Sequence, residues 1–272
     1  MTALAARPPA DLAPATSGVA RLREWWRDAA TMSGRALRLV TRDPDSLVLG
    51  VVLPIMLMVL FVYVFGGAFA VGTEYLNYVT PGIILLCAGY GAANTAIGVA
   101  RDATTGVIDR FRSMPPATST VLVGHVVASA AKNLATTAVV FGVAFIMGFR
   151  PGASLLEWLG AVGVILLFVL AITWVAVFVG VSVRSEEAAS GFTFFMLFLP
   201  YVSSAFVPPE TMPAWLRGFA EHQPVTPVIE TIRGLLVGTP MGNAPLLAVV
   251  WWVGIGAAFA VAAGIVFRNK GR

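Results

Sequence analysis

The sequence is poor in charged residues. Asp, Glu, Lys and Arg together make up 12% of its 272 residues, about half of the ~25% typical of soluble proteins. Hydrophobic residues make up 58%. Because a soluble fold cannot cover its surface with so few charges, this composition excludes a soluble globular domain and indicates an integral membrane protein.

Cysteine and histidine are also scarce. Cys87 is the only cysteine, which excludes an internal disulfide and a cysteine-based zinc site. His125 and His222 have no second ligand at metal-binding spacing, and the 14 acidic residues form no cluster. We therefore expect no metal site. The net charge of +4 is better explained by the rule that cytoplasmic loops are basic than by nucleic-acid binding.

Several catalytic motifs are absent. The chain has no G-x-x-x-x-G-K-[ST] phosphate loop, so it cannot hydrolyse ATP by that route, and it has no H-E-x-x-H zinc motif. Gly180-Val181-Ser182-Val183 has the G-x-S-x form of a rhomboid-like intramembrane serine protease. A nucleophilic serine needs a base within hydrogen-bond reach, and neither histidine falls on the last expected span. The protease is an unfavoured alternative, and we expect no catalytic residue.

Long intervals without charge mark the expected membrane spans. A spanning helix needs about 20 apolar residues. The sequence predicts an all-α protein with six such helices, at roughly 47–67, 80–100, 122–148, 156–183, 190–207 and 245–267. Residues 1–20 lack a continuous apolar core, so we expect a disordered tail there and not a signal peptide.

Basic residues are distributed unevenly between the two sides of these spans. Of the 18 Lys and Arg residues, 14 fall on the side of the N-terminus, three on the other side, and Lys132 within a span. The positive-inside rule therefore places both termini in the cytoplasm of a multi-pass protein. Lys132 lies near the start of its span. Its amine can extend to the cytoplasmic lipid head groups, or the residue can have a functional role within the membrane.

Residues 21–42 have the pattern of a helix lying on the inner membrane face. Polar residues recur there at spacings of three and four, which gives one polar stripe. Trp25 and Trp26 suit the head-group depth, and the arginines suit anionic lipid. Such a helix can be a general basic anchor or a collar against a partner subunit.

The segment at about 208–243 contains two short apolar pieces, around 213–220 and 225–237, which are too short to span. They can lie on the surface or enter the membrane and return, which requires burial against protein. Glu230 and Arg233 are three residues apart on the second piece and can face each other. We expect this segment to cap the outward end of the helix bundle, with Glu230 and Arg233 as an outside gate.

The loop after the second span predicts a short amphipathic helix. Gly106 permits a sharp turn, and Pro115-Pro116 ends the element. Its apolar face would consist of Val107, Ile108 and Phe111. Its charged face would consist of Asp109, Arg110 and Arg112. A connecting loop with basic residues and a helix that transmits force to a soluble partner both remain open.

Two segments resemble a known family. GVIDRFRSMP resembles the first cytoplasmic loop of ABC type-2 exporter permeases of the daunorubicin-resistance (DrrB-like) group. SSAFVPPETMPAWLRGFAEHQPVTPVIETIRGLLVG is similar to that group's segment between the fifth and sixth spans. The order, spacing and six-span layout also match, from about residue 20 to the C-terminus. The chain departs from the family in having Pro116 directly after Pro115.

The resemblance implies an ABCG-like (type V) exporter fold over residues 21–272. It implies a connecting helix at 21–42 and a coupling helix at about 104–116 that docks on an ABC ATPase, with Gly106 to Arg112 as the residues that couple to it. The implied assembly has two permease subunits, which we take as a homodimer, and two ATPase subunits that bind ATP and Mg. This chain itself would hold no cofactor.

The resemblance also implies a substrate path between the permease subunits, lined by the second and fifth spans. Candidate path residues are Asn94, Phe195, Met196 and Tyr201, since aromatic and methionine side chains suit broad apolar substrates. Ordinary packing or contact with membrane lipid also explains each of them. Expected substrates are amphiphilic drugs, antibiotics or lipids, with multidrug resistance as the outcome. The alternatives are export of cell-envelope lipid or glycolipid and a membrane scaffold without transport.

Overall fold

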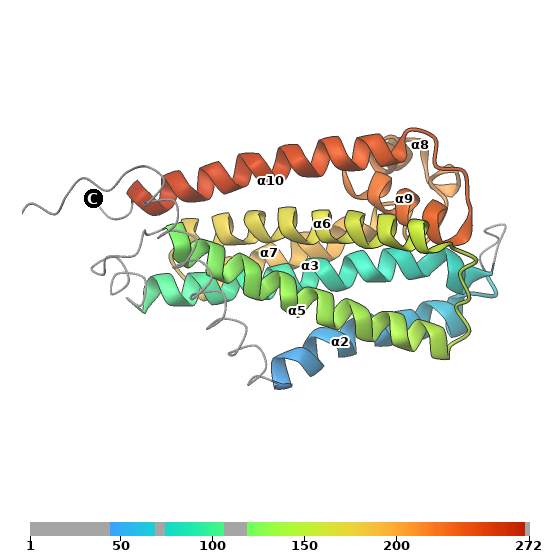
Figure 1. Ribbon diagram of the computed structural model, residues 1–272, viewed down its shortest axis with the longest axis horizontal. Coiled ribbons are helices and arrows are strands. Elements are labelled where there is room, and N and C mark those ends of the chain that lie inside the picture. Colours follow the sequence, from blue (N-terminus) through green and yellow to red (C-terminus); the bar gives the residue numbers. More distant parts are fainter. Residues whose placement is uncertain (1–43, 69–73, 106–118, 270–272) are drawn as a thin grey trace, which may run out of the picture.

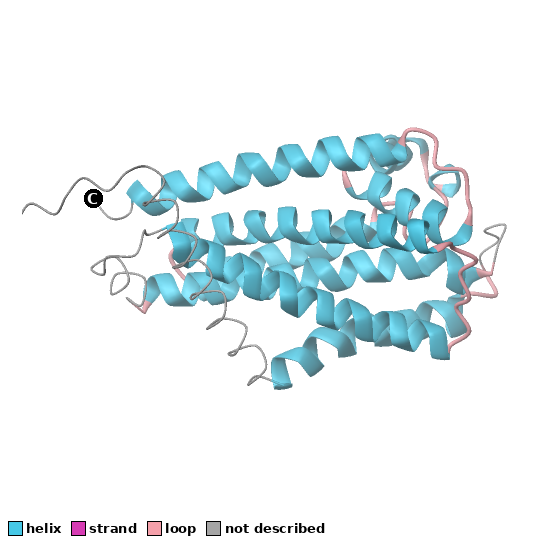
Figure 2. Ribbon diagram, in the orientation of Figure 1, coloured by secondary structure: helices cyan, strands magenta, loops and turns pink. Residues whose placement is uncertain are grey.

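The computed structural model describes residues 44–68, 74–105 and 119–269 (Figure 1). These residues form helices and loops, with no strand among them (Figure 2). The all-α class is therefore confirmed for this part of the chain. The tail at 1–20, the helix expected at 21–42 and residues 106–116 of the expected coupling helix lie outside these ranges.

Long apolar helices occupy four of the six expected span positions. They are α3 (Tyr75–Thr104), α5 (Ser119–Ile146), α6 (Leu155–Ser182) and α10 (Ala244–Asn269). At 1.5 Å per residue, the 26 residues of α10 extend about 39 Å, which exceeds the ~30 Å hydrocarbon core of a bilayer. Each of the four is long and apolar enough to cross a membrane.

The first and fifth expected spans are shorter helices. The first consists of α2 (Pro44–Val59) and a π-helical turn, η1 (Leu60–Phe65), with an apolar part that covers Gly50–Phe65. The fifth is α7 (Glu186–Tyr201), whose 16 residues extend about 24 Å. That these two shorter helices also cross the membrane, for a total of six spans, therefore stays a prediction.

Helix α7 ends at Tyr201, six residues before the predicted end of the fifth span. The amide of Gln223, the residue after α8, donates to the carbonyl oxygens of Leu199 near the end of α7 (3.2 Å) and of Val202 just after it (2.7 Å). Buried carbonyls need such partners. A side chain from the following segment thus replaces the helical hydrogen bonds that would have continued α7.

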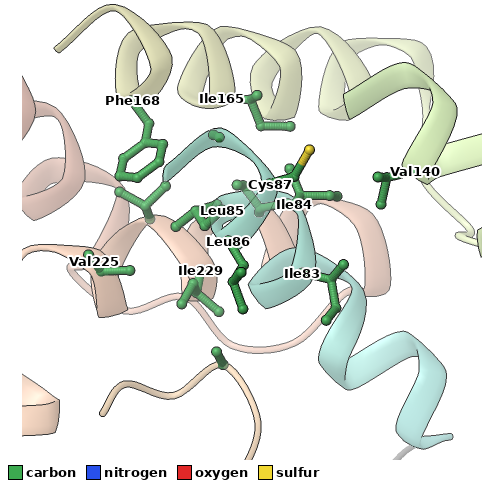
Figure 3. Close-up of a cluster of buried hydrophobic side chains, with 14 of the residues drawn as sticks. Ile83, Ile84, Leu85, Leu86, Cys87, Val140, Ile165, Phe168, Val225 and Ile229 are labelled. Atoms are coloured by element: carbon green, nitrogen blue, oxygen red, sulfur yellow. The ribbon is translucent and has the colours of Figure 1, made fainter. Parts of the chain in front are cut away.

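Helix α3 lies at the centre of the bundle, packed against α5, α6 and α7 (Figure 1). Other parts of the protein bury 67% of the apolar stretch of α3, compared with 22% of the apolar stretch of α10. Five consecutive residues of α3, Ile83 to Cys87, are all buried (Figure 3). Consecutive residues of a helix point in different directions, so α3 has protein on all sides at this level.

Glycines allow α3 to approach its neighbours closely. A Cβ atom on Gly180 of α6 would lie 2.6 Å from the carbonyl oxygen of Ala96 and 2.7 Å from the Cβ of Val99, both in α3. A Cβ on Gly82 of α3 would lie 2.6 Å from the Cβ of Ala205. Small residues at such crossings are typical of helix packing in membranes.

Two short helices follow α7, at the positions expected for them. After a 3-10 turn, η2 (Pro209–Thr211), come α8 (Ala214–His222) and α9 (Val225–Val237). Most of α9 is buried against α6, α10 and α3. It ends at Gly238, whose positive φ of 79° gives the left-handed conformation that often terminates helices.

The start of α9 lies between the long helices and not above them. The indole nitrogen of Trp252 donates to the carbonyl oxygen of Pro224 at 2.8 Å. Trp252 is eight residues inside the start of α10, which corresponds to about 12 Å along its axis. The α8–α9 connection therefore packs against the side of α10.

Candidate functional site

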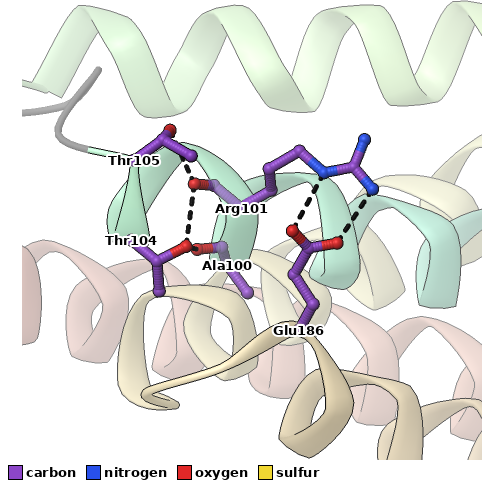
Figure 4. A network of polar contacts seen from close by, with 5 residues as sticks. All are labelled: Ala100, Arg101, Thr104, Thr105 and Glu186. Carbon is purple, nitrogen blue, oxygen red and sulfur yellow. Dashed lines mark hydrogen bonds and ion pairs between the residues drawn. The ribbon is translucent and has the colours of Figure 1, made fainter.

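At one end of the bundle, α3 is tied to α7 by a pair of opposite charges (Figure 4). The guanidinium of Arg101 contacts the carboxylate of Glu186 at two points, Nη2–Oε2 at 2.8 Å and Nε–Oε1 at 3.1 Å. The hydroxyls of Thr104 and Thr105 donate to the carbonyl oxygen of Arg101 and close the end of α3. This end of α3 leads directly into the predicted coupling loop.

A second polar contact links the two helices that border that loop. Nε2 of His125, in α5, lies 3.3 Å from Oδ2 of Asp102, in α3. The predicted coupling residues, Gly106 to Arg112, lie outside the described residues. The Asp102–His125 contact thus joins the described residues on the two sides of the loop. The Arg101–Glu186 pair joins the residues just before the loop to α7.

The predicted path residues do not form one group. Phe195 is 59% exposed and Met196 is buried, and both line the same cavity. Asn94 is half-buried on α3 and does not line that cavity. Tyr201 stacks on Phe206 with ring centroids 4.9 Å apart, and it is likewise outside the cavity.

The cavity that contains Phe195 and Met196 has a volume of about 430 Å³. We call it the lateral pocket. It lies between α6, α7, α10 and the end of α8, and its wall is apolar apart from a histidine and a glutamine. The lining residues are Ile172, Val175, Phe195, Met196, Leu199, Phe219, His222, Gln223, Pro224, Trp252, Ile255 and Phe259.

A polar cluster between α3, α5 and α6 was not predicted from the sequence. The hydroxyls of Thr95 and Ser129 are 2.6 Å apart, and Ser129 lies 3.4 Å from both the Thr173 hydroxyl and the Asn133 amide nitrogen. Side chains of this kind hold helices together across a membrane interior. The spacing of four between Ser129 and Asn133 on an apolar helix is the signal that could have revealed it.

Arg233 of α9 is buried, with 5% of the residue exposed, and it connects three segments. Its Nε donates to the carbonyl oxygen of Tyr78 in α3 (3.2 Å), and its Nη2 donates to that of Ser204 after α7 (2.6 Å). Its guanidinium carbon also lies 3.7 Å from the centroid of the Tyr78 ring. Charge-assisted hydrogen bonds and a cation over an aromatic ring are both stabilising when desolvated.

Glu230 and Arg233 are not in direct contact, and their role as an outside gate stays a prediction. No ion pair within 4.0 Å joins these two residues in the described structure. Their spacing allows them to face each other, but the guanidinium of Arg233 donates instead to the carbonyl oxygens of Tyr78 and Ser204. Burial raises the pKa of Glu230 above that of an ordinary carboxyl group, and the positive charge of Arg233 partly opposes this shift.

Comparison with known proteins identifies the class. Residues 28–237 match the ABC-2 type transporter family, and the chain belongs to that family. It is a membrane permease homologous to drug-resistance exporters, as the resemblance of its two motifs indicated. Membership of a permease family, together with the long apolar helices, makes it a multi-pass membrane component and not an enzyme.

Individual relatives cover almost the whole chain. The daunorubicin resistance ABC transporter permease protein DrrB1 of Streptomyces coeruleorubidus is 29% identical over 260 residues, 95% of this chain and 89% of the relative. A probable doxorubicin resistance ABC transporter permease protein, DrrC, of Mycobacterium tuberculosis is 28% identical over 94% of this chain and 93% of its own length. A putative transport permease, ycf38, of Porphyra purpurea is 26% identical over 74% of this chain and 70% of its own.

Proposed function

We propose that this protein is the membrane subunit of an ATP-driven exporter that moves amphiphilic drugs, antibiotics or lipids out of the cell. The observation that carries the proposal is the family match over residues 28–237, with drug-resistance permeases aligned over nearly the full chain. The sequence has no phosphate loop. ATP and Mg therefore belong to a separate ABC ATPase.

The proposed assembly contains two copies of this chain and two ATPase subunits in a bacterial plasma membrane. Each permease has six spans, with both termini in the cytoplasm, where the basic residues gather. Residues 104–116 form the coupling helix, and Gly106 to Arg112 contact the ATPase. The Asp102–His125 and Arg101–Glu186 pairs support this role, because they would pass a displacement of the loop to α5, α3 and α7.

The proposed transport cycle is alternating access. ATP closes the ATPase dimer, the coupling helix moves, and α3 and α7 rearrange around a path that includes Asn94, Phe195, Met196 and Tyr201. The α8–α9 segment caps the outward end, and Glu230 and Arg233 help to hold it closed. The contacts of Arg233 support the cap, since they attach α9 to α3 and to the chain after α7.

The test is transport in a reconstituted system. The permease and its ATPase partner are placed in liposomes, and uptake of daunorubicin into vesicles with outward-facing ATPase subunits is followed by fluorescence. We expect uptake that requires both subunits and hydrolysable ATP. The matched control is the same ATPase with its phosphate-loop lysine replaced. ATP-independent equilibration, or ATPase activity of the purified permease alone, would contradict the proposal.

A further inference from the structure

The chain just after α7 is irregular backbone that is nevertheless buried. Residues 202–206 form turns and not helix, and none of these five residues is more than 8% exposed. Buried N–H and C=O groups need hydrogen-bond partners within the protein, because water does not reach them. Irregular backbone in a membrane protein is tolerated only where such partners are provided.

Side chains from other elements provide these partners. The amide of Gln223 donates to the carbonyl oxygens of Leu199 (3.2 Å) and Val202 (2.7 Å). Nη2 of Arg233 in α9 donates to the carbonyl oxygen of Ser204 (2.6 Å). Two further bonds to this segment come from the hydroxyls of Thr226 in α9, which accepts from the Ser204 amide, and of Tyr75 in α3, which donates to the Phe206 carbonyl. The conformation of residues 202–206 therefore depends on the position of the α8–α9 segment.

The sequence of this segment is also compatible with helix. Residues 202–207 contain no proline and no glycine, and Pro208-Pro209 is the first strong stop signal after α7. The 16 residues of α7 extend about 24 Å, which is less than the ~30 Å hydrocarbon core of a bilayer. Adding the five residues 202–206 would lengthen the helix to about 32 Å, which is enough to cross that core.

Gln223 occupies the two carbonyl groups that a longer α7 would use itself. In an α-helix each N–H donates to the carbonyl four residues earlier. The amide of Ser203 would therefore donate to Leu199, and the amide of Phe206 would donate to Val202. If Gln223 withdraws, both carbonyls lose a donor, which is costly for buried groups. Winding the segment into helix restores both hydrogen bonds without water.

We infer that residues 202–206 are a joint that winds into helix and lengthens α7 when the α8–α9 segment moves away, and that Gln223 is the positioning residue that holds this joint unwound. Gln223 lies between α8 and α9, so displacement of the cap and lengthening of the path helix become one event. The part of the joint in transport rests on the proposed function. Its two conformations are a property of this chain alone.

The joint contains the only two adjacent serines of the sequence, Ser203 and Ser204, which allows a selective NMR measurement. Serine labelled isotopically in its carbonyl carbon and its amide nitrogen is incorporated into the purified permease in lipid nanodiscs. A spectrum filtered for directly bonded labelled pairs then contains the Ser203 carbonyl alone. Its chemical shift distinguishes helix from turn. We expect the turn signal in the wild type.

Gln223→Met removes both hydrogen bonds at a similar side-chain volume. Two neutral hydrogen bonds shift an equilibrium by about 5- to 100-fold, so the ratio of helical to turn signal should rise at least fivefold. The matched control is His222→Met, which introduces the same side chain at the neighbouring exposed residue and should give the wild-type spectrum. If Gln223→Met does not fold, Gln223→Asn provides the test, because its amide is too short to reach both carbonyls.

An unchanged signal ratio in the folded Gln223 variant would overturn the joint. Its part in transport is tested in the wild-type complex with the ATPase, trapped with ATP and vanadate, where we expect the helical signal to replace the turn signal. A turn signal in the trapped complex would overturn that part. Because the variants are measured without the ATPase, a failure of the proposed function would leave their result unchanged.

Discussion

The crossing of α3 and α6 predicts opposite effects for one substitution at two positions of the same helix. Gly180→Ala would place a Cβ 2.6 Å from the carbonyl oxygen of Ala96 and 2.7 Å from the Cβ of Val99. Gly163→Ala, also in α6, would place its Cβ where no heavy atom lies within 4 Å. The first position is in tight contact with the central helix, and the second is open.

The magnitudes follow from two effects. Replacing glycine by alanine inside a helix stabilises by about 0.5–1 kcal/mol at either position. Overpacking of a close contact costs about 1–3 kcal/mol, and it applies to Gly180 alone, because the obstructing atoms include the backbone of α3. We expect Gly163→Ala to raise the free energy of unfolding slightly. Gly180→Ala should lie about 1–3 kcal/mol below Gly163→Ala.

The assay is unfolding of the purified permease in mixed micelles with increasing mole fraction of SDS, followed by circular dichroism. Comparing two alanine variants of one helix removes the contribution of helix propensity. Equal midpoints for the two variants would refute the close α3–α6 contact. Gly180→Ser would provide a further variant, and it should be destabilised as well, because any Cβ meets the same atoms.

Further outcomes are expected at the two ends of the molecule. Arg233→Gln should lower the free energy of unfolding by about 1.5–3 kcal/mol for each lost charge-assisted hydrogen bond, whereas Glu230→Gln should not; equal losses in SDS unfolding would contradict this. Because burial raises the pKa of Glu230, its ionised form costs stability at neutral pH and nothing below the ordinary pKa of about 4.3. Glu230→Gln should therefore stabilise at neutral pH and flatten the decline in stability as pH rises above 4, measured by thermal unfolding. In a cysteine-free background, a cysteine at Thr211 should react with an impermeant thiol reagent in intact cells and one at Ser113 should not; labelling at Ser113 would contradict the six-span topology. Phe111→Ala should weaken co-purification of the ATPase, since an aromatic anchor is commonly worth ~2 kcal/mol or more, and unchanged co-purification would leave the loop as a plain connection.

The long helices could be predicted because charge-free length is a local property. The same holds for α8 and α9, which are separated by Gln223 and Pro224 in the sequence and in the structure. The end of α7 could not be predicted in this way. It depends on the amide of Gln223, which is more than 20 residues away from the carbonyls that it satisfies.

The partner of Arg233 illustrates the same limit. Helical spacing correctly placed Glu230 and Arg233 on one helix, but it gave no information on the carbonyl groups of Tyr78 and Ser204. The path residues were chosen by side-chain type. The structure brings Phe195 and Met196 to one pocket, whereas Asn94 lies elsewhere on α3. Local pattern therefore predicts elements well, and contacts between elements much less well.

The burial of α3 has a consequence for how the protein is made. α3 is less apolar than α6 but is more enclosed by protein, and its principal neighbours, α5, α6 and α7, are all synthesised after it. During synthesis Thr95 of α3 therefore lacks its partner Ser129 until α5 arrives. A chain that stalls before α5 would leave α3 without these neighbours, and we expect membrane quality-control proteases to recognise it.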